Sequence, residues 1–239
     1  DTLGEAHTTM ALYKRGYEWD WAGAEKEHQT ALRLAPGYAT GHQRYAFHLL
    51  ALGRFDEAIA EMKRAQELDP VSLTISTTLG LLYHYARRYD QAVEEYHNAL
   101  AMDPNFASAR SYLGELYIMK SMYPEAIAEQ KKAVDLMQSA PIAVSALGLA
   151  YARSGDRAAA RKVLEQMLAE RDQRGYYPAS RIALVYLGLD EKDRAFEWLA
   201  RAVEERDGTL IFFKTNPLWD PLRADPRYAE LLRRMNLAP

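Results

Sequence analysis

The chain has 239 residues, of which 49% are hydrophobic and 26% are charged, and its formal net charge is -3. This composition is typical of a globular protein. Because acidic and basic residues are interleaved along the chain, no long basic stripe is available to bind nucleic acid, and a nucleic-acid partner is not expected. The absence of cysteine excludes disulfides, thiol catalysis and cysteine metal sites, and it fits either a reducing or an oxidising compartment.

The start of the chain carries no targeting signal. Residues 1–10 lack the basic and apolar regions of a signal peptide, and no apolar run approaches the roughly eighteen residues of a membrane span. We therefore expect a soluble protein without direct membrane insertion, and a cytoplasmic location is slightly favoured. Because the chain begins at Asp1 and enters a helical pattern almost at once, we also expect a fragment of something longer.

A motif of Leu-Gly-x-x-Tyr repeats through the middle of the chain. It begins at Leu79, Leu113 and Leu147, a step of 34 residues each time. Two small positions keep the same step, and they are held by Ala46, Gly80, Gly114 and Gly148, and by Ala58, Ala92, Ala126 and Ala160. A stack of helical hairpins requires such fixed spacing, because each hairpin must present the same contacts to the next.

Prolines and polar turns mark the expected helix ends in chain order. Pro36, Pro70 and Pro104 each follow a segment with apolar residues three or four apart, so each proline stops a helix. Short polar turns separate the two helices of a unit, and one register at the start of the second helix holds residues suited to a helix N-terminus: Asp56, Asp90 and Pro124. Each unit is therefore predicted to contain two helices.

Some units depart from the spacing. Ala24 follows Ala11 by thirteen residues rather than twelve, across residues 19–21, and a second shift falls in residues 174–177. Gln138 and Asp172 stand where other units have proline, which predicts looser joints there. Terminal units are expected to deviate, because one of their faces meets solvent. The six predicted units span approximately residues 5–37, 38–72, 73–106, 107–140, 141–174 and 176–207.

Beyond Gly208 the repeat pattern ends. Large apolar residues separated by prolines follow, and then a short helix carries an apolar stripe of Tyr228, Leu231, Leu232 and Met235. We interpret residues 208–239 as a cap that covers the open end of the array formed by residues 1–207.

The small, aromatic and proline positions resemble the tetratricopeptide repeat (TPR) family over roughly residues 5–205. The resemblance implies an all-α fold, a right-handed superhelical solenoid of about six helical hairpins, followed here by the C-terminal capping helix. It also implies a non-enzymatic scaffold for protein–protein interaction. The tail is similar to the ends of multidomain bacterial signalling proteins, so the alternative function is a regulatory or sensor module of a larger protein with a kinase, cyclase or winged-helix domain.

In this family the first helix of each hairpin lines a concave groove. Thirteen residues at the family's groove positions form the predicted groove set: Thr40, Gln43, Phe47, Leu50, Thr77, Leu81, His84, Tyr85, Ser111, Glu115, Ile118, Met119 and Arg153. Further groove positions fall on Thr74, Ser108, Ser145, Leu149 and Ala152. These mixed hydroxyl, apolar and aromatic groups fit an apolar or aromatic peptide segment. They lack the Lys and Asn with which chaperone-adaptor members grip a carboxylate, so a chaperone tail is not expected.

Packing offers an alternative interpretation for part of this pattern. The apolar members of the groove set could serve only to pack adjacent hairpins. The repeated tyrosines Tyr83, Tyr117, Tyr151 and Tyr186 are predicted to pack between hairpins rather than to bind a ligand. A bulky side chain at Gly80, Gly114 or Gly148 is predicted to force two helices apart.

No pattern in the sequence predicts catalysis, a cofactor or a metal. Two Glu-x-x-His pairs, at Glu25 and Glu94, resemble those of di-iron bundles, but two units separate them and the further ligands are missing. Glu115, His84 and Tyr85 could meet in the groove as an acid and a base, although helical stacking often places such groups together. The expected partner is a protein or peptide, and self-association through an end of the array is left open.

Overall fold

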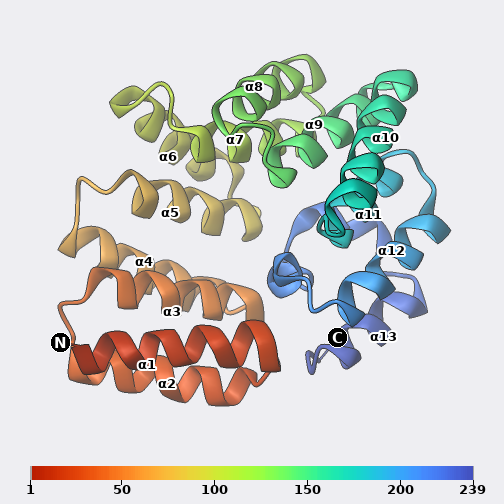
Figure 1. Cartoon of the computed structure of the whole chain (residues 1–239). Coiled ribbons are helices and arrows are strands. Elements are labelled where there is room, and N and C mark those ends of the chain that lie inside the picture. Colours follow the sequence, from red (N-terminus) through yellow and green to blue (C-terminus); the bar gives the residue numbers. More distant parts are fainter. Residues whose placement is uncertain (1, 239) are drawn as a thin grey trace. The chain divides into compact units, whose positions relative to one another are not determined.

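The computed structural model describes residues 2–238, and within that range it contains helices and no strand. Consecutive helices form six hairpins (Figure 1): α1 (Thr2–Tyr13) with α2 (Trp21–Leu34), α3 (Ala39–Leu52) with α4 (Phe55–Leu68), α5 (Leu73–Tyr85) with α6 (Tyr89–Met102), α7 (Ala107–Met119) with α8 (Tyr123–Leu136), α9 (Pro141–Ser154) with α10 (Arg157–Arg174), and α11 (Ala179–Gly188) with α12 (Lys192–Glu204). The predicted all-α fold of repeated hairpins is confirmed.

The chain divides into two compact units. The first unit contains the chain up to Asn98, together with Ile211–Asn216 and the residues from Leu232 onwards. The second unit contains Ala99–Leu210 and Pro217–Leu231. The tail, which the sequence predicted as one cap, therefore contributes residues to both units.

Helix ends follow the sequence signals. Helices α2, α4 and α6 each end two residues before a proline, at Leu34, Leu68 and Met102. Asp56 and Asp90 lie in the first turns of α4 and α6, and Pro124 lies in the first turn of α8. Carboxylates also cap two other helices, since Asp20 accepts a hydrogen bond from the Gly23 amide (2.8 Å) and Asp156 from the Ala159 amide (3.0 Å).

A π-helical turn absorbs the insertion in the first unit. Lys14–Glu18 form this turn, η1, and Trp19 ends it in a left-handed conformation with φ 55°. A π-helical turn holds one more residue than an α-helical turn, so the small residues on either side keep their places in the stack. Ala11 and Ala24 are both fully buried.

The two joints without the repeat proline differ from each other. At the first, Gln138 and Ser139 both adopt positive φ, 50° and 60°, before α9 begins. At the second, nothing stops the helix at Asp172, so α10 continues to Arg174 and reaches 18 residues where α8 has 14. Arg171 bridges this joint, because it donates to the Tyr177 carbonyl oxygen (2.6 Å) and pairs with Glu205.

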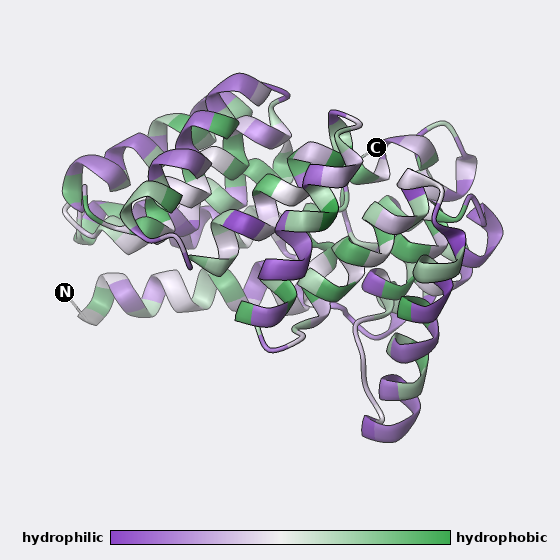
Figure 2. Cartoon of the chain, turned by 90° about the horizontal axis from the view of Figure 1, so that it is seen from above, coloured by the Kyte–Doolittle hydropathy of each residue, from purple (hydrophilic) through white to green (hydrophobic). Residues whose placement is uncertain are grey.

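The repeated small residues allow helices to approach closely. A Cβ at Gly80 would lie 2.6 Å from the Tyr96 ring, and one at Gly114 would lie 2.6 Å from the Gln130 amide. Their predicted packing role is confirmed. Tyr83 is buried, whereas the tyrosines at the equivalent positions of later units are half-buried. Figure 2 shows hydrophobic and hydrophilic residues alternating along the helices, as expected for amphipathic helices with one buried face.

Candidate functional site

Most of the predicted groove residues that belong to the first unit lie in its interior. Gln43, Leu50, Thr77, Leu81, His84 and Tyr85 are buried, Phe47 is half-buried and Thr40 is exposed. The Gln43 side-chain amide donates to Thr78 Oγ1 (3.4 Å), which places it within the packing of α3 against α5. The buried members therefore present little side-chain surface to a ligand, and their role in binding stays a prediction.

A tail residue contacts the two aromatic members of this set. Phe212 ends the 3-10 turn η2 (Gly208–Phe212), and its ring centroid lies 5.6 Å from that of Phe47 and 5.9 Å from that of Tyr85. The Tyr85 and Phe212 rings are nearly perpendicular, at 86°, which is the favoured edge-to-face arrangement. In the first unit, the chain's own tail therefore takes the place predicted for a partner's aromatic side chain.

This tail segment is a fixed part of the first unit. Phe213, Met235 and Leu237 are almost completely buried. The Trp21 indole donates to the Met235 carbonyl oxygen (2.8 Å), and Lys214 Nζ donates to the Ala238 carbonyl oxygen (2.8 Å). Exposing three such apolar side chains would cost roughly 5 to 9 kcal/mol. That cost is comparable to the whole binding free energy of a micromolar ligand, about 8 kcal/mol, so a peptide would not displace the tail.

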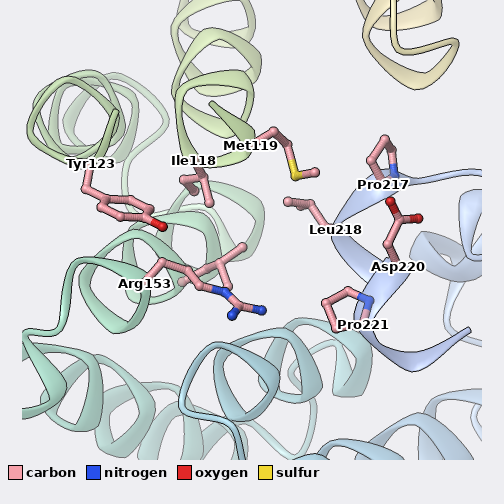
Figure 3. Close-up of a pocket in the computed structure, with 9 residues that line it drawn as sticks. Ile118, Met119, Tyr123, Arg153, Pro217, Leu218, Asp220 and Pro221 are labelled. Carbon is pink, nitrogen blue, oxygen red and sulfur yellow. The ribbon is translucent and has the colours of Figure 1, made fainter. Parts of the chain in front are cut away.

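The second unit keeps a pocket where its groove residues meet the tail. The pocket has a volume of about 230 Å³ and is lined by three members of the predicted groove set, Ile118, Met119 and Arg153. Its opposite wall comes from the 3-10 turn η3 (Pro217–Leu222), as Figure 3 shows. The remaining lining residues are Tyr123, Leu149, Pro217, Leu218, Asp220 and Pro221. The repeat pattern gives no sign of this wall, because residues 217–221 do not belong to the repeat.

Two charged side chains line the pocket: a weakly paired arginine and a carboxylate that accepts a short hydrogen bond from another arginine. Arg153 Nη1 lies 3.8 Å from Asp190 Oδ1, and these side chains are 30% and 75% exposed, so the pair is weak. Asp220 accepts a hydrogen bond from Arg223 Nε at 2.7 Å. Arg153 can therefore bind an added anionic group, while the charge of Asp220 is already balanced by Arg223.

Glu115 and Ser111, predicted to face the groove, are buried in the second unit. Burial raises the pKa of the Glu115 carboxyl group to about 7, and nearby Arg181 opposes this rise. Among the described residues, Ser111 Oγ has no hydrogen-bond partner. These two residues shape the interior next to the pocket rather than its surface.

The candidate acid and base residues are divided between the two units. His84 and Tyr85 belong to the first unit, with ring centroids 5.7 Å apart, and Glu115 belongs to the second. Glu25 accepts hydrogen bonds from the Tyr45 hydroxyl group and the Arg54 guanidinium group. Residues 2–238 contain no cluster of three or more side chains suited to a metal ion, and no helix within that range is long and apolar enough to cross a membrane.

Comparison with known proteins identifies the repeat. Models of the tetratricopeptide repeat match residues 18–74, 77–141 and 143–175. No curated protein matches the sequence. Similar solved structures include PilW, a widely conserved type IV pilus biogenesis factor, with 19% identity over 98% of each chain and a TM-score of 0.63. A thermophilic TPR protein of Thermus thermophilus has 24% identity over 82% of this chain and 99% of its own, with a TM-score of 0.59. MamA has 22% identity over 69% of this chain and 96% of its own, with a TM-score of 0.52. At these identities the likeness shows a shared fold.

Proposed function

The chain belongs to the tetratricopeptide repeat family, whose members are generally non-enzymatic protein-interaction scaffolds, and from that premise we propose that it binds a peptide segment of a partner protein. The proposed site is the pocket of the second unit. The observation that carries the proposal is that Ile118, Met119 and Arg153, three residues at the family's groove positions, line one pocket.

The size of the pocket favours a peptide over a small-molecule ligand. Its volume is about 230 Å³, whereas sites for small molecules and cofactors usually enclose roughly 300 to 1,000 Å³. A pocket of this size accommodates one or two side chains of a longer segment. The rest of the segment would lie outside it, on the surface of α7 and α9.

The chemistry of the lining selects the kind of side chain. Ile118, Met119, Leu149 and Leu218 supply apolar contacts, and the Met119 thioether can adapt to different shapes. Arg153 supplies a cation at the same site. We therefore propose a partner segment that inserts an apolar side chain and carries Asp or Glu next to it.

Substitution of the pocket residues tests this proposal. Synthetic peptides with a central Leu beside Asp or Glu would be screened for binding by fluorescence anisotropy. Met119→Asp and Arg153→Glu should each weaken the best peptide by about 5- to 150-fold, the effect of losing 1 to 3 kcal/mol at an interface anchor.

Matched controls separate the pocket from general effects of charge. Met102→Asp changes an exposed methionine on α6, and Arg64→Glu changes an arginine of α4 that pairs with Glu67. Both controls should bind the peptide as the wild type does. Full binding by folded Met119→Asp and Arg153→Glu variants would rule the pocket out. The alternative, a regulatory module of a larger signalling protein, stays a prediction.

A further inference from the structure

The π-helical turn η1 of the first hairpin buries an arginine. Arg15 is only 6% exposed, and among the described residues its Nε and Nη1 atoms are buried and have no hydrogen-bond partner. Burial, and after it the positive charge of Arg44, lowers the pKa of the Arg15 guanidinium to about 10, so this group is still a cation at neutral pH. A neighbouring carboxylate would raise this pKa instead. Arg15 is therefore a buried positive charge whose balancing negative charge does not come from the residues around it.

The packing of the repeat does not require this charge. Ala11 of α1 aligns with Ala46 of α3, and four residues later Arg15 stands where α3 has Leu50. Leu50 is fully buried and fills the same position in the second hairpin without an ion. An apolar residue of similar size usually stabilises such a position at least as well as a buried charge does. The cation therefore points to a role beyond packing, and π-helical turns are frequent at functional sites.

Two buried histidines lie close to Arg15. His28 of α2 and His48 of α3 are completely buried, and their ring centroids are 5.4 Å apart. Among residues 2–238, none of their four ring nitrogens has a hydrogen-bond partner. Burial is the main cause of the low pKa of both rings, and the charge of Arg15 lowers the pKa of each ring further, which places the guanidinium near both. Residues of η1, α2 and α3 thus bring unused N–H donors together in the interior of the first unit.

The charges at this cluster favour an anion as its ligand. The positive charge of Arg15 repels a metal ion, although imidazoles alone could bind one. Each neutral imidazole presents one N–H donor, and the guanidinium adds the donors of Nε and Nη1. The nearby Glu25 carboxylate already accepts hydrogen bonds from Tyr45 and Arg54. An anion would balance the buried charge and accept the unused hydrogen bonds.

We propose that Arg15, His28 and His48 form an internal binding site for a monatomic anion such as chloride. The donor atoms are buried, so the carboxylate of a partner protein or a phosphate group does not reach them. A monatomic ion is small enough to enter through local opening of the hairpins. This site belongs to the first unit, whereas the proposed peptide pocket belongs to the second.

The end of the chain covers one side of the anion site. The Trp21 ring centroid lies 6.2 Å from that of His48, and the Trp21 indole donates to the carbonyl oxygen of Met235, which directly follows α13 (Pro226–Arg234). Met235 is completely buried and belongs to the first unit. A bound anion should therefore stabilise the first two hairpins together with the tail residues that pack on them.

Thermal unfolding at pH 7.5 and constant ionic strength tests the proposal. Sodium gluconate, whose anion is too large for the site, would be replaced stepwise by sodium chloride up to about 200 mM. The Tm of the wild type should rise by about 3 to 10 °C, because an anion that binds only the folded state stabilises it. Arg15→Leu should show no such rise. In gluconate this variant should be at least as stable as the wild type, because it removes a buried charge.

A matched variant separates the site from a general effect of salt. Arg64→Leu removes an exposed arginine of α4 that pairs with Glu67, and it should keep the full chloride response. A wild type with the same Tm in gluconate and in chloride overturns the proposal. A chloride response of Arg15→Leu as large as that of the wild type also overturns it.

Bromide locates the ion directly and needs no variant, so it decides the proposal even if Arg15→Leu fails to fold. Crystals of the full chain grown in sodium bromide should show an anomalous scattering peak within hydrogen-bond distance of Arg15 Nε or Nη1 and beside the rings of His28 and His48. Crystals with bromide only on the outer surface of the protein would contradict the proposal, whatever the effect of chloride on Tm.

Discussion

The tail meets the predicted groove differently in the two units. In the first unit Phe212 lies against Phe47 and Tyr85, and the tail residues around it are buried. In the second unit η3 forms one wall of a pocket whose other wall includes Met119 and Arg153. The hairpins of both units follow the same repeat, so the unrepeated tail residues decide where a ligand has room.

The two units also differ in the titratable side chains that they bury. The first unit buries His28, His48 and His84, whose ring nitrogens have no hydrogen-bond partner among the described residues. Burial lowers the pKa of His28 and His84 to about 3 and that of His48 to about 4. The second unit buries Glu115, whose pKa is raised to about 7. The two units should therefore respond to pH in opposite directions.

Acid should destabilise the first unit by the largest amount. A histidine with a lowered pKa stabilises the fold above its ordinary pKa of 6.5, and this contribution is lost as pH falls toward 3 to 4. The loss approaches about 1.4 kcal/mol per histidine for each pH unit. Hydrogen exchange at pH 7.5 and 5 should show lost amide protection in α3 and α5, and His84→Phe should reduce that loss in α5. Equal loss in α9 and α11 would contradict the difference between the units.

Removing the Phe212 ring should destabilise the first unit and spare the pocket. The Phe212 ring is only half-buried, so its removal costs less than that of a fully buried phenylalanine. Phe212→Ala should therefore lower the free energy of unfolding by about 2 kcal/mol. Phe212→Leu keeps most of the apolar volume and should cost less. Urea unfolding measures both variants. If Phe212→Ala instead abolished peptide binding at the second unit, the separation of the two sites would be wrong.

The repeat glycines allow a matched test of packing in the two units. Gly80→Ala should cost about 1 to 3 kcal/mol, because its Cβ would press on the fully buried, rigid ring of Tyr96. Gly114→Ala should cost less, since Gln130 can rotate away, although it would lose its 2.7 Å hydrogen bond to the Ser111 carbonyl oxygen. Thermal unfolding of both variants gives the order, and a reversed order would show that the ring yields more easily than the amide.

The smallest effect is expected at Glu115. A carboxyl group with a raised pKa stabilises the fold below pH 4.5, and this contribution is lost as pH rises through about 7. Glu115→Gln removes that dependence and should be more stable than the wild type at pH 8 by about 1 kcal/mol, since unpaired Arg181 offsets part of the gain. Denaturant unfolding at pH 5 and pH 8 measures the difference. A variant less stable than the wild type at pH 8, where Glu115 is ionised, would mean that the interaction of its charge with Arg181 is net favourable.

The repeated positions allowed the hairpins to be predicted from sequence. Positions such as Gly80 and Pro36 make contacts close in sequence, and these contacts recur with the period of the repeat. One alignment of the repeat therefore locates all the hairpins. The one-residue insertion near Trp19 was also visible, although the structure places its π-helical turn slightly earlier, at Lys14–Glu18. Periodicity records an extra residue, but it does not say which turn will accommodate it.

The tail's contacts could not be predicted in the same way. Phe212 meets Phe47 across more than 160 residues, and neither residue belongs to the repeat signature. The apolar run before Pro217 signalled that the tail is buried, but not the surface on which it packs. Three of the predicted groove residues line the pocket, yet Pro217 and Leu218 on the opposite wall carried no signal of their own.

A charge exchange across the pocket tests the binding account most directly. The affinity of one acidic peptide, with Leu beside Asp, and of its Asp→Lys counterpart would be measured against the wild type and Arg153→Glu. The wild type should prefer the acidic peptide by at least about fivefold, and Arg153→Glu should prefer the basic one. If both proteins bound the two peptides with the same preference, Arg153 would not contact the ligand and the pocket would not be its site.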